Sequence, residues 1–228
     1  YIKSHESLLD VLKHAGIDVE WFDNQSGCKG VCEGVKNETL SLQSFPDLCA
    51  SGRCYDEALV ERLKDELKKN SGSNDDKVVV LHQLGNHGPS YYQRYPEPFG
   101  RFAPVCETAD LNKCQKNEIV NAYDNGVLYT DSVLDSLISA LKSQSQYSAA
   151  MLYVADHGES LGENGVYLHG LPYSIAPREQ THVPMTWWLD KDFVGSTGLD
   201  NDCLYKNADD TYSHANLFSS ILGLMQVA

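Results

Sequence analysis

Two continuous apolar segments of the chain end abruptly at turns that contain histidine. Residues 77–84 end at Gly85-Asn86-His87-Gly88-Pro89, and residues 149–155 end at Asp156-His157-Gly158. Uninterrupted runs rich in Val, Leu and Ala are typical of strands that are buried on both faces, as in a parallel sheet. Ligands of open α/β sheets bind beyond the carboxyl ends of such strands. The two turns are therefore the first places to look for a functional site.

Helical patterns separate these segments and place the chain in the α/β class. Leucine, valine and alanine recur at helical spacing, and a strand is expected at 19–22 before a Cys-rich loop that runs to residue 54. Strand and helix alternate, which predicts a doubly wound, mostly parallel sheet flanked by helices. A later strand is expected at 183–189, where Pro184 favours a strand start or an edge. The expected helices are 4–14 capped by Ser4, 56–69 capped by Asp56, 117–141 capped by Asn117, and a last one capped by Ser213.

Charge and hydropathy exclude some functions. The formal net charge is −14, with no basic cluster beyond Lys68-Lys69, so a surface that tracks nucleic-acid phosphates is excluded. No apolar run approaches the roughly 20 residues needed to span a bilayer, and the first residues do not form a signal peptide. We expect residues 1–228 to be a single partial catalytic domain. It begins without Met and ends in an apolar, helix-like run, so we expect it to be cut from a longer protein at both ends.

Six of the seven cysteines fall into close pairs, and Cys203 is left over. The pairs are Cys28/Cys32, Cys49/Cys54 and Cys106/Cys114. Zinc-thiolate sites are the alternative, but two CxxC halves are absent and no histidine follows at finger spacing. Paired cysteines in short polar loops favour disulfides, with connectivity assigned from proximity. Three disulfides would place the domain in an oxidising compartment such as the bacterial periplasm.

The polar residues after the two apolar segments are candidate metal ligands. A turn at Gly158 can aim Asp156 and His157 at one point, and glycines in the next loop allow His169 to fold back toward them. His87 follows the other segment. Two or more imidazoles favour Zn²⁺ over Ca²⁺ or Mg²⁺, which prefer oxygen ligands. Taken singly, each histidine is more often a loop hydrogen-bonding residue, and an Asp-His pair before Gly is more often a cap and a turn.

Other polar and aromatic residues have simpler interpretations. His82 lies inside an apolar segment and is expected to be a hydrogen-bonded core residue. Tyr91, Tyr92 and Tyr95 either line a groove or lie in a surface loop rich in Tyr and Pro, and the surface loop is favoured.

The fifteen residues from Asp156 to Gly170 resemble the signature of the lipid A phosphoethanolamine transferases. This family includes the mobile colistin resistance enzymes and belongs to the alkaline phosphatase and sulfatase superfamily. Three further stretches resemble the same family: Trp21-Phe22-Asp23-Asn24 with Cys28-Lys29-Gly30, residues 81–89, and Asn121-Ala122-Tyr123-Asp124-Asn125.

The resemblance implies a zinc-dependent transfer of phosphoethanolamine from phosphatidylethanolamine to lipid A at the periplasmic face of the inner membrane. Asp156 and His157 match ligands of the principal zinc, and His87 and His169 match residues that bind the phosphoryl group or a second zinc. Glu159 either orients a ligand from behind or caps the following turn. The resemblance also implies a nucleophilic Thr and a further acidic ligand upstream of Tyr1, so we expect this chain alone to be inactive.

Two other functions stay open at this point. One is a related metal-dependent phosphatase, sulfatase or glycerol-phosphate transferase. The other is a non-catalytic binding module that keeps the fold. The sequence does not choose the acceptor, the oligomeric state or the fate of Cys203.

Overall fold

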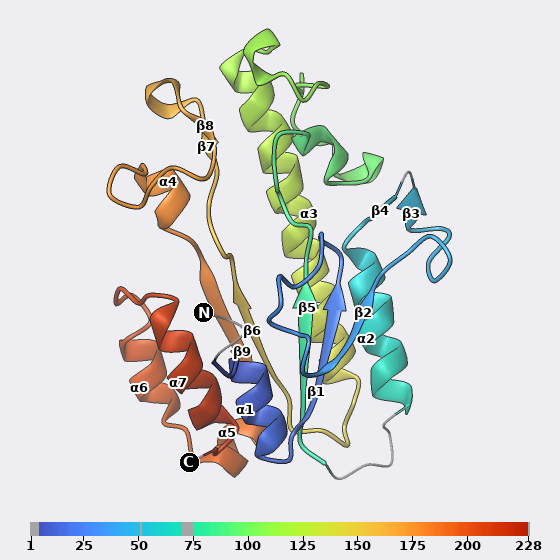
Figure 1. Ribbon diagram of the computed structural model, residues 1–228, viewed down its shortest axis with the longest axis vertical. Helices are drawn as coiled ribbons and strands as arrows, with labels where there is room; N and C mark the ends of the chain where they lie inside the picture. Colours follow the sequence, from blue (N-terminus) through green and yellow to red (C-terminus); the bar gives the residue numbers. More distant parts are fainter. Residues whose placement is uncertain (1–4, 51, 70–74, 228) are drawn as a thin grey trace.

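The computed structural model describes residues 5–50, 52–69 and 75–227. Its centre is a three-stranded parallel sheet with the order β2-β1-β5 (Figure 1). The register pairs Asp18 with Lys77 at one end and Asp23 with His82 at the other. The three strands are β1 (Asp18–Asp23), β2 (Lys36–Thr39) and β5 (Lys77–His82).

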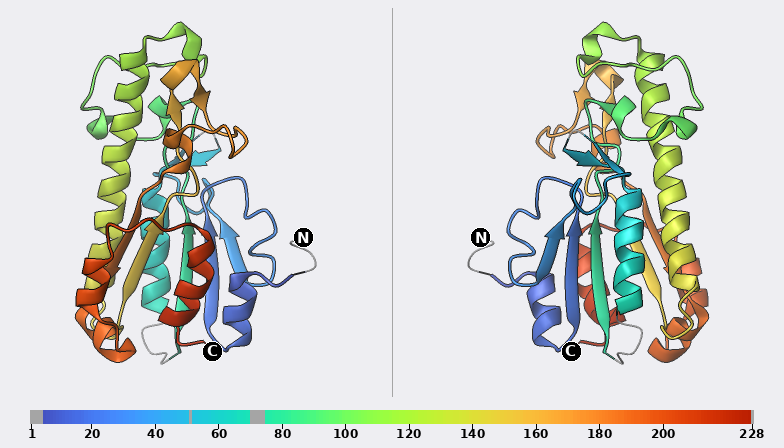
Figure 2. Two further views of the ribbon diagram at one scale, coloured as in Figure 1. Left: turned by 90° about the vertical axis from the view of Figure 1, so that its left-hand side faces the viewer. Right: turned by 90° about the vertical axis from the view of Figure 1, so that its right-hand side faces the viewer.

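Helices cover both faces of this sheet (Figures 1 and 2). On one face, α2 (Glu57–Lys69) and α3 (Lys116–Lys142) pack against Val79 and Leu81 of β5. On the other, α1 (Leu8–His14) and α7 (Ala215–Leu224) pack against Val78 and Val80. The alternation of side chains along β5 therefore serves both layers, as the predicted α/β class requires.

The second apolar segment forms β6 (Ala150–Val154), which pairs antiparallel with β9 (Met185–Leu189) in a separate two-stranded sheet. Within the described part of the chain, no backbone pairing joins β5 to β6. The expectation of strands buried on both faces is wrong in this respect, because every residue of β5 and β6 is only half-buried. Among the described residues, β5 and β6 each pair with another strand along one edge only, and their side chains stay partly exposed.

Short elements complete the fold. Most lie in connections that the sequence predicted as loops. They are β3 (Cys49–Ala50), β4 (Arg53–Cys54), β7 (Ser160–Leu161), β8 (Tyr167–Leu168), α4 (Arg178–Thr181), α5 (Lys191–Thr197), α6 (Asn201–Lys206), and the 3-10 turns η2 (Tyr91–Gln93), η3 (Glu97–Phe99), η4 (Leu111–Lys113) and η5 (Glu163–Gly165).

The helix caps differ from those predicted. Ser4 lies outside the described residues, and Ser7 caps α1 in a capping box with Asp10. Gln115, in a box with Glu118, replaces Asn117 at the start of α3. Residue His214, not Ser213, flanks the start of α7. Several neighbouring residues in each of these segments are able to cap a helix. The composition of a segment therefore predicts that a helix forms, but not at which residue it begins.

All three predicted cysteine pairs are disulfides, and Cys203 is free and exposed. The bonds join Cys28 to Cys32, Cys49 to Cys54, and Cys106 to Cys114. The alternative of zinc-thiolate sites is thereby excluded for these six residues, because a sulfur in a disulfide offers no thiolate.

The disulfide between Cys106 and Cys114 fastens the loop that precedes α3. Cys106 is buried, and Cys114, which follows η4, is partly buried. Both pack in the apolar cluster that contains Ile119 and Ala122 of α3. The amide of Cys106 also donates to the carbonyl oxygen of Glu118 at 3.0 Å. The disulfide therefore holds this loop against the first turns of α3.

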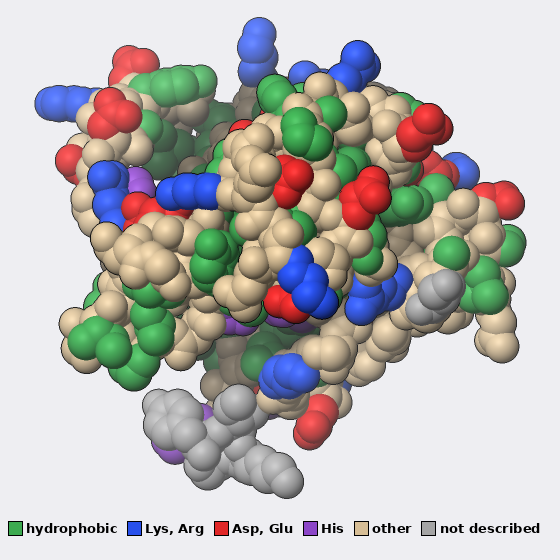
Figure 3. Space-filling view, turned by 90° about the horizontal axis from the view of Figure 1, so that it is seen from above, with side chains coloured by type: hydrophobic (Ala, Val, Ile, Leu, Met, Phe, Trp, Pro, Cys, Tyr) green, Lys and Arg blue, Asp and Glu red, His purple; other side chains and the backbone are tan. Residues whose placement is uncertain are grey.

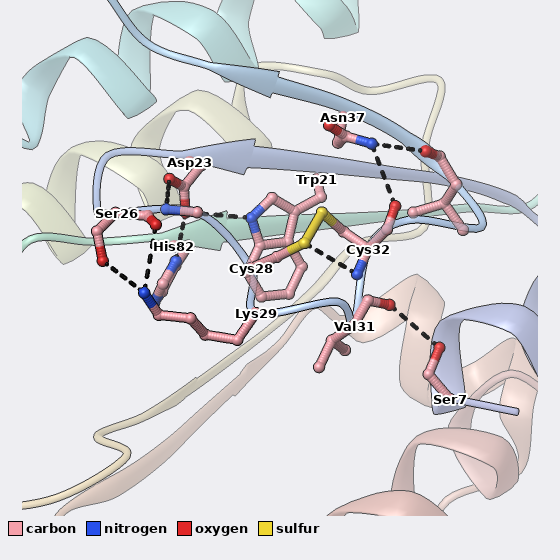
Figure 4. Close-up of a disulfide and its surroundings, with 12 residues drawn as sticks. Ser7, Trp21, Asp23, Ser26, Cys28, Lys29, Val31, Cys32, Asn37 and His82 are labelled. Carbon is pink, nitrogen blue, oxygen red and sulfur yellow. Dashed lines mark hydrogen bonds and ion pairs between the residues drawn. A yellow bond between two sulfur atoms is a disulfide. The ribbon is translucent and has the colours of Figure 1, made fainter. Parts of the chain in front are cut away.

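The disulfide between Cys28 and Cys32 closes a loop that packs beside Trp21 against the face of the central sheet (Figure 4). Beside it, His82 Nδ1 lies 2.5 Å from Asp23 Oδ1, which confirms that His82 is hydrogen-bonded. Burial alone would raise the pKa of Asp23, but the hydrogen bonds from His82, Gly27 and Trp21 outweigh it and lower the pKa.

Among the described residues, no helix has both the length and the apolar composition to cross a bilayer.

Candidate metal centre

Three histidines meet beyond the carboxyl ends of β5 and β6. His87 follows β5, His157 follows β6, and His169 follows β8. One potential ligand nitrogen from each lies within 4.8 Å of the other two. The ring centroids of His157 and His169 are 3.9 Å apart and stacked, and those of His87 and His169 are 4.9 Å apart. The convergence that the sequence predicted from strand ends is therefore present in the fold.

Hydrogen bonds fix the tautomer of these rings. The Nδ1 atom of His87 lies 2.8 Å from the carbonyl oxygen of Gly88, and Nδ1 of His157 lies 3.0 Å from that of Gly158. Nδ1 of His169 lies 3.1 Å from Oε1 of Glu159. A carbonyl or carboxylate oxygen only accepts, so each Nδ1 carries a hydrogen, and in the neutral ring Nε2 then presents a lone pair. Three neutral imidazoles in this state are good ligands for a borderline-soft divalent ion such as Zn²⁺.

Asp156 lies at the rim of this cluster. Its side chain is 83% exposed, and its Oδ1 is 3.8 Å from Nε2 of His157. Zinc bonds of about 2.0–2.2 Å at a tetrahedral angle separate two ligand atoms by roughly 3.4 Å. A small rotation of the exposed Asp156 side chain would reach that separation. The residues present therefore fit a zinc ion, with three imidazoles together and Asp156 at their rim.

The buried carboxylate of Glu159 links His169 to the loop that carries His87. Its Oε1 accepts from the Gly88 amide at 3.0 Å as well as from His169, and its Oε2 accepts from the Tyr91 hydroxyl at 3.2 Å. The carboxylate is buried, so these donors replace water. Burial, followed by the charge of Glu159, raises the pKa of Tyr91, which stays a donor.

The predicted surface position of the tyrosines is wrong for Tyr91 and Tyr95. Tyr91 is 2% exposed and Tyr95 is 8% exposed. Tyr91 packs with Ile119 and Ala122 of α3 while its hydroxyl reaches Glu159. A segment in which a buried tyrosine extends its hydroxyl to a polar partner has the same amino-acid composition as a surface loop. The sequence alone therefore does not distinguish the two.

A pocket of about 350 Å³ opens beside the histidines. Its wall combines Asp156, His157 and His169 with Leu171, Tyr173, Ala176, Gln180, Thr181 and His214. Nε2 of His214, at the start of α7, lies 2.8 Å from the carbonyl oxygen of Ala155 and joins this helix to the end of β6. Seen from above, histidine shows only in small areas, one of them recessed between acidic and basic groups (Figure 3). The pocket is thus polar on its histidine side and apolar on the side of Leu171 and Tyr173.

The disulfide cysteines contribute to the site only indirectly. Within the described part of the chain, neither the histidine cluster nor the pocket wall includes a cysteine. Cys106 and Cys114 come nearest in the packing, because their cluster also contains Tyr91, whose hydroxyl bonds Glu159. The bond between Cys106 and Cys114 therefore supports the apolar layer behind the site and supplies no ligand.

An α/β fold with clustered imidazoles and an aspartate beyond its strand ends has the architecture of the alkaline phosphatase and sulfatase class. The chain belongs to the sulfatase family, whose model, "Sulfatase", matches residues 2–227.

Similar proteins are more specific. The chain is 49% identical over 224 residues to phosphoethanolamine transferase EptA of Salmonella typhimurium, covering 97% of this chain and 40% of that protein. It is 42% identical over 207 residues to phosphatidylethanolamine transferase Mcr-1 of Escherichia coli, covering 88% and 38%. The soluble domain of lipooligosaccharide phosphoethanolamine transferase A from Neisseria meningitidis superposes with a TM-score of 0.91 at 45% identity, covering 96% and 65%. The chain thus spans about two-fifths of the length of these curated relatives.

Proposed function

We propose that the full-length protein transfers phosphoethanolamine from phosphatidylethanolamine to lipid A in the periplasm, and that this chain supplies part of its zinc site. The observation that carries the proposal is the convergence of His87, His157 and His169 beside Asp156. Identities of 42–49% to transferases of phosphoethanolamine support the donor group. The three disulfides support an oxidising compartment.

We assign Asp156 and His157 to the principal zinc, and His87 and His169 to the phosphoryl group or a second zinc. When bound, Zn²⁺ lowers the pKa of an attacking hydroxyl and neutralises charge on the transferring group. The chain's own contribution is orientation: the Nδ1 hydrogen bonds aim the Nε2 lone pairs of His87 and His169 into one space. These lone pairs suit a metal ion, and a ring that instead binds a phosphoryl oxygen directly would have to carry a proton on Nε2 and donate it.

We propose that the nucleophile lies outside this chain. Thr181 is the threonine that lines the pocket, but its hydroxyl lies 3.4 Å from the Pro177 carbonyl oxygen within the short helix α4. Among the described residues, no hydrogen bond joins the Thr181 hydroxyl to a histidine or a carboxylate that could act as a base. A Thr181→Ala variant of the full-length protein should therefore keep its transfer activity, whereas a Thr181 nucleophile would make that variant inactive.

The proposal is tested with the full-length protein in a bacterium whose lipid A is then analysed by mass spectrometry. We expect added phosphoethanolamine with the wild type and its loss with His157→Ala. His14→Ala is the control, because His14 is an exposed histidine on α1. Purified protein that releases phosphate or sulfate from aryl esters without modifying lipid A would favour a related hydrolase. Absence of both activities would favour a binding module.

A further inference from the structure

The loop that carries His87 is held by buried charged side chains instead of by backbone pairing. Leu84, Gly85 and Gly88 each donate their amide to a carboxylate, and the carbonyl oxygen of His87 accepts from an arginine. Glu159, already described at the metal centre, supplies one of these partners. We propose that Asp56 and Arg94, which supply the others, are positioning residues that set the place of His87 in the cluster. The inference rests on the metal-binding role proposed above.

Asp56 holds the first half of the loop. It lies one residue before α2, and its Oδ1 and Oδ2 accept from the amides of Leu84 and Gly85 at 2.8 and 2.9 Å. Asn24, which follows β1, donates to the same carboxylate at 2.7 Å. Asp56 is only 5% exposed, so water does not compete for these donors. Because α2 is packed in the core through Leu59 and Leu63, Asp56 ties the loop to a rigid element.

Arg94 holds the residue that carries the ligand. Its Nε donates to the carbonyl oxygen of His87 at 2.6 Å, and the residue as a whole is 7% exposed. Its Nη1 is buried without a hydrogen-bond partner among the described residues. A buried guanidinium with an unused donor is costly for stability. Among the described residues, the hydrogen bond that this side chain makes in return is the directed bond to the His87 carbonyl oxygen.

Two acids partly offset the cost of burying the Arg94 charge. Asp56 and Glu159 interact favourably with the guanidinium, although burial and the neighbouring Arg53 together outweigh them. The two acids and one base thus form a buried set that surrounds residues 84–88. Asn86 adds a neutral anchor to α3. With its amide oriented so that the nitrogen faces the Gly126 carbonyl oxygen, it donates to that oxygen and accepts from the Val127 amide. A shift of the loop backbone would carry the His87 ring with it, and displacements near 1 Å at a catalytic site can cost about 100-fold in rate.

The test uses Arg94→Lys, Arg94→Met and Asp56→Asn in the full-length protein, with Arg53→Met as the matched control. Arg53 is a nearby exposed arginine that bonds Gln93, and among the described residues no hydrogen bond joins its side chain to residues 84–88. We expect the three variants to lower zinc affinity by about 10- to 100-fold in chelator competition, as outer partners of metal ligands do. Lysine keeps the charge but not the directed Nε bond, so Arg94→Lys should lose affinity as well.

Amide exchange separates positioning from general damage to the fold. We expect faster exchange at Leu84, Gly85 and Gly88 in the variants, with β1 amides as protected as in the wild type. The proposal is overturned if Arg94→Lys and Asp56→Asn bind zinc within about twofold of the wild type, or if exchange rises equally in β1. If the wild type itself binds no zinc, the proposed function fails instead. Wild-type binding with unaffected variants would remove this inference alone.

Discussion

His169 and the loop of His87 share a single carboxylate oxygen. Oε1 of Glu159 lies 3.1 Å from Nδ1 of His169 and accepts the Gly88 amide at 3.0 Å. Glu159→Gln keeps the size of the side chain, but one amide oxygen cannot replace two carboxylate oxygens that serve three donors. We expect zinc affinity to fall by about 10- to 100-fold and stability to fall by about 1–3 kcal/mol. Chelator competition and urea unfolding measure the two effects.

Glu163→Gln is the matched control for this prediction. Glu163 is on the same loop, accepts the amide of Leu161 at 2.6 Å and lies 3.6 Å from Nζ of Lys116, so its partners are outside the histidine cluster. We expect its zinc affinity to match the wild type. Equal losses in both variants would mean that the loop as a whole, and not the carboxylate of Glu159, determines the affinity.

Asp156 distinguishes a site of histidines alone from one that includes the aspartate. Its side chain is exposed, so Asp156→Ala should change the free energy of unfolding of the metal-free protein by less than about 0.5 kcal/mol. If Asp156 is a ligand, zinc affinity should still fall at least about tenfold. Asp192→Ala, at an acidic position in the first turn of α5, is the control. Wild-type zinc affinity in Asp156→Ala would remove Asp156 from the ligand set.

The sequence was sufficient for the long helices, for four of the strands (β1, β5, β6 and β9) and for the convergence of the histidines. It was wrong for β2, which belongs to the central sheet but lies in the segment predicted as a loop. Apolar runs that stop at polar turns predict strands, and carboxyl ends of strands gather at one end of an α/β fold. Gly162 and Gly165 have φ of +108° and +75°, which is how the loop before His169 turns back. Proximity in the sequence was also enough to pair Cys106 with Cys114. These features depend on residues that are close in sequence, so they can be predicted without knowing which distant residues come into contact.

The partners of the site could not be predicted, because they are distant in sequence. Asp56 had the pattern of a helix cap, and its contacts with residues 84 and 85 depend on how α2 packs beside β5. The pairing of β6 with β9 instead of β5 has the same cause. Periodicity identifies a strand but carries no information about its neighbour. Arg94 and Tyr91 had no local signal that separates them from an ordinary polar loop.

A buried ion-pair network at the other end of β1 and β5 predicts a large effect of Lys77. Its Nζ lies 2.7 Å from Asp18, 2.9 Å from Glu20 and 2.8 Å from Glu66. Lys77→Met would leave two nearly buried carboxylates without this partner, which we expect to cost about 3–5 kcal/mol in urea unfolding. Lys68→Met, which removes an exposed pair with Asp65 at 3.7 Å, should cost less than about 1 kcal/mol. Similar costs in the two variants would contradict this assignment.

The same network predicts a dependence on pH. Burial alone would lower the pKa of Lys77, but the bonds to Asp18, Glu66 and Glu20 outweigh it and raise the pKa. A base with a raised pKa in the folded state stabilises the fold fully below its unfolded pKa of about 10.4, and this stabilisation is lost as pH rises through the folded value. The difference in unfolding free energy between wild type and Lys77→Met should thus be constant from neutral pH to about 10 and then shrink. A gap that narrows already near neutral pH would assign the stabilisation to other groups.

Gly126, in the middle of α3, is predicted to reverse the usual effect of alanine in a helix. Gly→Ala in a helix interior ordinarily stabilises by about 0.8–1.0 kcal/mol. A Cβ at Gly126 would collide with the Asn86 side chain, which bonds the Gly126 carbonyl at 3.1 Å and the Val127 amide at 3.0 Å. Displacing Asn86 also displaces His87 beside it, so Gly126→Ala should destabilise by about 1–3 kcal/mol and weaken zinc binding. Gly195→Ala in α5 has open space at its Cβ and should be neutral or stabilising. Urea unfolding with zinc competition checks both variants, and a stabilised Gly126→Ala with normal zinc affinity would show that Asn86 does not anchor the loop.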